Sequence, residues 1–174
     1  MKRIICAFAW VGAVVSLVAQ PRMPLFVGET VAGEIVEVPG AVKSKAVLCL
    51  AYDQKASASL EAWMAPAYLR LVAKHGMFSD TYEADVWFVP MFVGMNKAAY
   101  GPTLKKFRKS TEPEVAEHVL FYQGELEPFQ EALGMERKDV PYIFVIDDQG
   151  RVLHRTEGAF ELEKLDRLEE VLMD

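Results

Sequence analysis

Cysteine is scarce in this chain of 174 residues, which has only two, Cys6 and Cys49. Because they lie far apart, the sequence contains no C-x-x-C pair and no framework of disulfides. It also lacks a glycine-rich phosphate-binding loop and a recognisable Ser-His-Asp catalytic motif. The three histidines, His75, His118 and His154, have no short ligand spacing. We therefore expect neither a metal ion nor a cofactor.

Positive charge is also in short supply, with 19 lysines and arginines against 25 acidic residues and a formal net charge of −6. An acidic chain repels the phosphate backbone, so a nucleic-acid partner is not expected. The main exception is the run Lys105–Lys109, "KKFRK", which is a candidate surface for an acidic partner or anionic head groups. A solvated helix face explains the same run.

The first nineteen residues have the pattern of a secretory signal peptide. Lys2 and Arg3 precede an uncharged apolar run, residues 4–18, and Ala19 precedes Gln20 and Pro21. The alternative is a retained membrane anchor formed by residues 4–20. We expect cleavage after Ala19, so that residues 1–19 are a signal peptide and residues 20–174 form one domain that is secreted or periplasmic. The membrane is a partner only if this segment stays uncleaved.

Cleavage changes the chemistry expected of the mature chain. It removes two basic residues and no acidic one, so the net charge goes from −6 to −8. Cys49 is then the single cysteine in an oxidising compartment, and an intramolecular disulfide is impossible.

The apolar pattern predicts one α/β domain. Apolar residues form near-continuous runs, typical of buried strands, or alternate with polar residues in six segments. These are residues 28–40, 45–52, 84–94, 118–123, 142–147 and 151–156. Residues with helical spacing occur at 53–76, 100–110, 125–135 and 160–173. Ser57 or Ser59 is the expected N-cap of the first helix, Pro66 is expected to kink it, and Pro90 is expected where its strand leaves the sheet.

One segment carries a specific resemblance. The stretch "VPYIFVIDDQGRVLHRTEG", residues 140–158, resembles the thioredoxin-like superfamily, in particular its TlpA and peroxiredoxin-like branch. There a proline in a cis peptide bond begins a strand that turns through a D-x-x-G hairpin. The resemblance extends from Phe26 to Leu172. It implies a three-layer α/β/α fold with a central mixed β-sheet, an N-terminal β-hairpin extension and a cis Val140–Pro141 bond.

The redox half of the family pattern is missing. In redox-active relatives the first core strand leads into C-x-x-C at the start of the next helix, and that position corresponds to residues 55–58, "KASA". No catalytic residue can therefore be assigned. The alternative is a one-cysteine thiol oxidoreductase or peroxidase that uses Cys49. Its place between Leu48 and Leu50 favours a buried, inert side chain.

The resemblance implies a redox-inactive module that binds a protein or peptide partner in the cell envelope, as a chaperone or an assembly factor. Its expected groove joins the end of the first core strand to the proline segment, where an extended chain could pair with the backbone. The residues placed there are Tyr52, Asp53, Gln54, Lys55, Ser57, Val140 and Pro141. We expect Tyr52 and Lys55 to be exposed.

Two further patterns have ordinary explanations. Met91 and Met95 could form a soft-metal pair, but methionine commonly fills gaps in a core. Asp147 and Asp148 lie in a predicted turn, where aspartate has backbone reasons to occur. Neither pair is expected to form a reactive site.

The signal-peptide interpretation makes the first testable prediction. When the full-length chain is expressed in an exporting host, mass spectrometry of the recovered protein should find a terminus at or near Gln20, because the apolar run ends at Ala19. An intact Met1 on protein extracted from membranes would instead establish an anchor.

Overall fold

The structure is a computed structural model that describes residues 20–73 and 82–174. The predicted signal peptide, His75 and the predicted end of the first helix at Gly76 therefore lie outside the described residues. None of the helices in the described part of the chain is long and apolar enough to cross a membrane.

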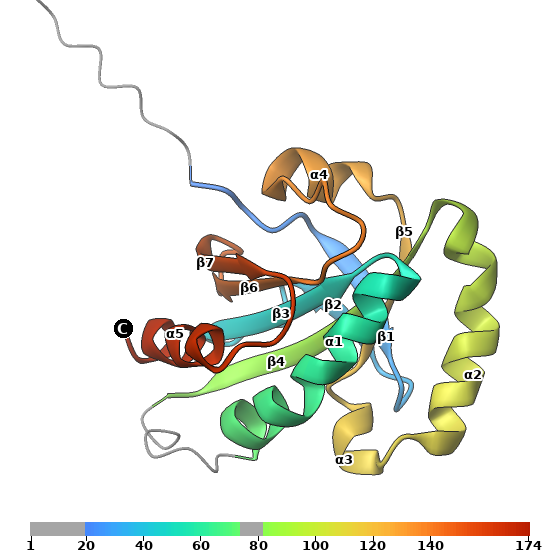
Figure 1. Cartoon of the computed structure of the whole chain (residues 1–174), viewed down its shortest axis with the longest axis horizontal. Helices are drawn as coiled ribbons and strands as arrows, with labels where there is room; N and C mark the ends of the chain where they lie inside the picture. The colour runs from blue at the N-terminus through green and yellow to red at the C-terminus, as the bar shows by residue number, and fades with distance from the viewer. Residues whose placement is uncertain (1–19, 74–81) are drawn as a thin grey trace, which may run out of the picture.

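A single mixed sheet of seven strands forms the middle of the molecule (Figure 1). Its spatial order is β2-β1-β5-β4-β3-β6-β7. The strands are β1 Phe26–Thr30, β2 Ile35–Val38, β3 Lys45–Ala51, β4 Ala84–Val93, β5 Leu120–Gly124, β6 Tyr142–Asp147 and β7 Val152–Glu157. The pairs β3·β4 and β4·β5 are parallel, and the other pairs are antiparallel. The first two strands form the N-terminal hairpin.

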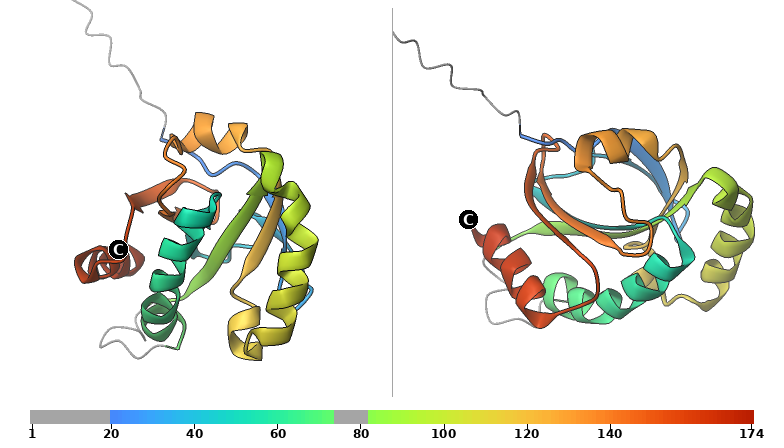
Figure 2. Two further views of the ribbon diagram at one scale, coloured as in Figure 1. Left: turned by 45° about the vertical axis from the view of Figure 1, so that its right-hand side comes forward. Right: turned by 45° about the horizontal axis from the view of Figure 1, so that its top comes forward.

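Helices cover both faces of the sheet (Figure 2). They are α1 Gln54–Ala67, which continues into the π-helical turn η1 Tyr68–Val72, the 3₁₀ helix η3 Gly94–Ala99, α2 Tyr100–Ser110, α3 Pro113–Ala116, α4 Glu127–Leu133 and α5 Leu162–Met173. On one face α1 and α5 pack over the central strands, and α2 packs over β5. On the other face lies α4, with the segment that follows it. This mixed sheet between helices confirms the predicted fold class.

Strand β3 is the centre of the core. Every residue from Ala46 to Ala51 is at most 1 % exposed, because β4 and β6 flank the strand and helices cover it. Alternation divides its side chains between the two faces: Leu48 and Leu50 face the α4 side, whereas Val47 and Cys49 face α1. A strand buried on both faces needs the continuous apolar run seen in the sequence.

The residues just before β1 cover the outer edge of β7. The backbone N–H of Met23 donates to the carbonyl of Gly150 at 2.8 Å, and that of Val152 donates to the carbonyl of Pro21 at 3.0 Å. The side chain of Gln20 donates to the carbonyl of Val152 at 3.0 Å. These bonds use backbone groups that an edge strand would otherwise leave open to another chain.

Two expectations about prolines are wrong. The cis peptide bond among the described residues is Val38–Pro39, and the Val140–Pro141 bond is trans. Pro141 directly precedes β6, so its missing N–H costs no bond of the ladder, and the trans isomer is favoured for an ordinary X-Pro bond. Pro90 does not end its strand either. It lies where the pairing of β4 passes from β3 to β5, so the strand continues to Val93.

The turn between β6 and β7 is organised by a carboxylate. Oδ1 of Asp147 accepts from the backbone N–H groups of Gln149, at 3.0 Å, and Arg151, at 2.8 Å, and Oδ2 accepts from Nε of Arg151 at 2.6 Å. Burial acts to raise the pKa of Asp147, but these hydrogen bonds outweigh it and hold the pKa below its ordinary value of 3.8. Asp147 thus has the turn-forming role expected of it.

This turn yields a pH-dependent prediction. Asp147→Asn should lower the free energy of unfolding at pH 7 by about 1 kcal/mol, because the amide oxygen can still accept the two backbone N–H groups but loses the negative charge that strengthens these bonds and the screened pair with Arg151. A lowered pKa stabilises the fold above about pH 4, and this contribution is lost as the pH falls through the lower folded value. Urea titrations at pH 7 and in acid should therefore show the difference from wild type shrinking in acid. The matched control, Asp148→Asn, alters an exposed neighbour, and an equal effect of both variants would contradict the assignment.

Candidate functional site

The start of α1 is held by Asp53, the first polar residue after β3. Its Oδ1 accepts from the backbone N–H of Lys55 at 3.0 Å, and its carbonyl accepts from the N–H and the hydroxyl of Ser57 at 2.8 and 3.0 Å. Asp53 is therefore the N-cap, and the expected caps Ser57 and Ser59 are wrong. An aspartate directly between a buried strand and a helical pattern is the sequence feature that identifies the cap.

Tyr52 is a packing residue, contrary to its expected exposure. It is 7 % exposed, and its hydroxyl donates to the carbonyl of Met135 at 3.0 Å. Its ring stacks on that of Tyr142, with 6.5 Å between the centroids. Burial, together with Tyr142 and the nearby carboxylates of Asp53 and Asp139, raises the pKa of Tyr52 to about 12. Its hydroxyl thus stays neutral and ties the segment after α4 to the sheet.

An ion pair, and no open groove, joins the start of α1 to the proline segment. Nζ of Lys55 lies 3.6 Å from Oδ2 of Asp139, whose Oδ1 lies 3.6 Å from Nε of Arg137. Val140 and Pro141 are both buried. The structure therefore brings the two halves of the expected groove together and leaves Lys55 exposed as expected, but it buries Tyr52, Val140 and Pro141.

A hollow opens on the other side of the α1 start, between α1, the end of β4 and α2. Its volume is about 380 Å³. It includes four of the expected groove residues, Tyr52, Asp53, Gln54 and Ser57. The lining residues that sequence reasoning missed are Glu61, Pro90, Met91, Phe92, Asn96, Ala99, Thr103 and Phe107. Most of the exposed lining is apolar.

The hollow continues as a groove between α1 and α2. A smaller cavity of about 40 Å³ shares Ser57, Glu61, Pro90 and Phe107 with it, and extends along α1 to Leu60 and Met64. We call the two together the α1/α2 groove. One wall comes from α1, the other from α2, and β4 forms the floor.

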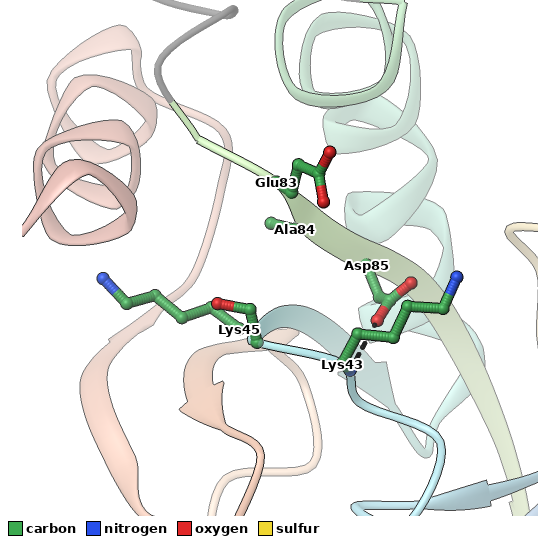
Figure 3. Close-up of a pocket in the computed structure, with 6 residues that line it drawn as sticks. Lys43, Lys45, Glu83, Ala84 and Asp85 are labelled. Carbon is green, nitrogen blue, oxygen red and sulfur yellow. Dashed lines mark hydrogen bonds between the residues drawn. The ribbon is translucent and has the colours of Figure 1, made fainter.

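A further hollow lies at the opposite end of the sheet, where β3 and β4 begin (Figure 3). It measures about 120 Å³ and has two lysines, Lys43 and Lys45, and two acids, Glu83 and Asp85. Nζ of Lys45 donates to the carbonyls of Val171 and Leu172 at 3.0 and 3.2 Å, so it caps the end of α5. The backbone N–H of Lys43 donates to Asp85 at 3.3 Å. These contacts are structural.

Cys49 lies in the middle of the sheet. It faces Phe88 of β4 and Ile143 of β6 in the ladder and is 0 % exposed. Burial raises the pKa of its thiol far above the ordinary value. A thiol in this position is neutral and out of contact with solvent, which is the buried position expected for it.

Comparisons with known proteins identify the fold. No family model and no curated protein matches the sequence. Solved structures do match: the thioredoxin domain of a thiol-disulfide oxidoreductase from Bacteroides vulgatus has a TM-score of 0.58 at 13 % identity, over 90 % of this chain and 99 % of that one. BsSco, of the Sco family of cytochrome c oxidase assembly proteins, has a TM-score of 0.57 at 10 % identity, over 88 % and 94 %. A putative thiol:disulfide interchange protein DsbE from Chlorobium tepidum has a TM-score of 0.54 at 18 % identity, over 91 % and 97 %.

This chain has a thioredoxin-like fold.

Within this thioredoxin-like fold, the start of α1 reads Gln54-Lys55-Ala56-Ser57 and contains no sulfur. The structure of BsSco is described with a disulfide switch. The described part of this chain holds one cysteine, which is buried. At the position where redox-active relatives have C-x-x-C, this chain therefore has a helix start without thiols.

The remaining candidate residues do not form a reactive cluster. Met91 is 4 % exposed and Met95 is 99 % exposed, so the two methionines point into different environments. Among residues 20–73 and 82–174, no three histidine, cysteine or acidic side chains gather as metal ligands would. Nδ1 of His118 lies 2.9 Å from the carbonyl of Val86 and holds the end of a strand.

The basic run Lys105–Lys109 lies along α2 and is largely exposed, with Phe107 half-buried beneath it. Arg108 pairs with the carboxylate of Glu29, and its Nε also donates to the carbonyl of Val31 at 3.4 Å. One cation of the run thus fastens α2 to the N-terminal hairpin. The lysines of the run are exposed and remain an alternative binding surface to the groove.

Tyr52 provides the prediction from this site. Tyr52→Phe should lower the free energy of unfolding by about 1–3 kcal/mol, because it leaves the buried carbonyl of Met135 without its donor. Tyr52→Ala should cost about 3–5 kcal/mol through the lost packing. Tyr68→Phe is the matched control, since its hydroxyl makes no hydrogen bond with a described residue. Urea unfolding in which Tyr52→Ala matches wild type would restore the exposed, partner-binding interpretation of Tyr52.

Proposed function

We propose that this chain is an extracytoplasmic, redox-inactive thioredoxin-like protein that binds a protein or peptide partner in the cell envelope, as a chaperone or assembly module. The observation that carries the proposal is the burial of the one described cysteine in β3, away from the α1 start. A thiol-disulfide reaction needs an accessible thiolate at that start.

The proposed cell-envelope role is supported by similarity to two kinds of protein. The solved structures of the same fold include a thiol:disulfide interchange protein and a member of a family of assembly proteins. The signal-peptide pattern of residues 1–19 supports the same compartment.

The competing function is a one-cysteine thiol oxidoreductase or peroxidase that uses Cys49. Such an enzyme must expose the sulfur and ionise it near neutral pH. Cys49 would have to leave a strand that is paired on both sides, and its raised pKa disfavours the thiolate. The geometry therefore favours a binding function.

A redox assay tests the proposal. Purified mature protein should neither reduce insulin disulfides nor consume peroxide above the level of Cys49→Ala, because Cys49, the one cysteine of the described residues, is buried. A maleimide reagent should label Cys49 rapidly in denaturant, and in native buffer only at the slow rate at which the strand opens. Turnover that disappears in Cys49→Ala, together with rapid native labelling, would show that the protein is a thiol enzyme.

A further inference from the structure

The α1/α2 groove combines an apolar floor with a charge of one sign. Its floor and α2 wall are formed by Pro90, Phe92 and Phe107, and its α1 wall carries two carboxylates, Asp53 and Glu61. At about 380 Å³, the main hollow falls within the usual size of ligand pockets.

Neither hollow of the groove has a lysine or arginine in its lining. Three basic side chains near it are paired elsewhere, Lys55 with Asp139, Lys97 with Glu125 and Arg108 with Glu29, and the exposed lysines of α2 line neither hollow. Glu61 is exposed and makes no ion pair with a described residue. The groove therefore presents uncompensated negative charge beside apolar surface, which complements a basic and apolar ligand.

The spacing of the two carboxylates defines the ligand further. Asp53 and Glu61 are eight positions apart along α1, or ~12 Å at the helical rise. In an extended peptide, side chains at i and i+4 lie on one face about 13 Å apart, with the side chain at i+2 between them on the same face. Two basic side chains could thus reach both carboxylates while an apolar one enters the floor between them.

We propose that the α1/α2 groove binds an extended segment of a partner protein with the pattern basic-x-apolar-x-basic. The proposal rests on the binding function above and names the chemistry of its partner. The apolar side chain packs over Pro90 and Phe107, and the two cations pair with Asp53 and Glu61 at the rim. Lys55 stays with Asp139 and does not compete for the carboxylates.

Fluorescence anisotropy with capped, labelled peptides tests the pattern on the mature chain. The probe has the core lysine-threonine-leucine-threonine-lysine. One comparison peptide replaces both lysines by glutamate, and another replaces leucine by serine. We expect the probe to bind, with an affinity that falls at high salt. Both comparison peptides should bind at least several-fold more weakly, because one lacks the basic side chains and the other lacks the apolar side chain.

Substitutions that keep the fold locate the site. Asp53→Asn retains a capping oxygen for α1 and Glu61→Gln retains the size of an exposed side chain, so both should leave thermal melting almost unchanged. Each should weaken the probe about two- to fivefold, and the double variant roughly tenfold, as expected for exposed charge pairs. The matched control is Asp148→Asn with Glu131→Gln, which removes the same charges at a distant turn and on α4. It should bind the probe like wild type.

Several results would overturn the proposal. It is wrong if the glutamate peptide binds as well as the probe, if the control variant weakens the probe as much as Asp53→Asn with Glu61→Gln, or if no peptide binds. It is also wrong if sedimentation shows a dimer that the groove variant dissociates, or if Lys105→Glu with Lys106→Glu abolishes probe binding while the groove variant does not. These outcomes leave the redox result untouched, whereas thiol turnover by Cys49 would refute the binding function itself.

Discussion

A strand that is paired on both edges and covered on both faces accepts only apolar side chains, and β3 imposes this condition on the middle of the fold. Its residues Ala46 to Ala51 are almost fully buried, so the first position at which the chain can carry polarity is the exit from the strand. There Tyr52 still packs inward, and Asp53 is the first residue whose side chain serves a helix end. The place of Asp53 in the candidate site therefore follows from where β3 ends.

Polar groups that do enter the interior are matched by donors. Glu169 of α5 is 2 % exposed, and its carboxylate accepts from Arg70 of η1 at 2.9 Å and from the hydroxyl of Tyr82 at 3.3 Å. The indole of Trp63 donates to the carbonyl of Gly158 at 3.0 Å, across from α1 to the segment before α5. No buried side-chain nitrogen or oxygen of the described residues lacks a partner. Such contacts fix α1 against α5, which leaves its opposite side to form the groove with α2.

The sequence predicts the frame of the fold better than its site, for physical reasons. Continuous apolar runs identify β3 and β6, and leucines at helical spacing identify α5, because burial acts on each residue locally. The exposure of Tyr52 could not be predicted, since it depends on the carbonyl of Met135, far along the chain. The α2 wall of the groove was missed for the same reason: Phe107 meets Ser57 only through the tertiary packing of two helices.

The start of α1 shows how one structural feature can serve different chemistry. The unpaired N–H groups and the dipole of a helix start stabilise negative charge, and in redox-active thioredoxin-like proteins this charge belongs to a thiolate. In this chain the carboxylate of Asp53, the N-cap just before that position, supplies a negative charge and accepts the N–H of Lys55. A capping carboxylate can attract a cation but cannot exchange a disulfide, because it has no sulfur. In the binding function that we propose, this helix start recognises a basic segment and takes no part in disulfide exchange.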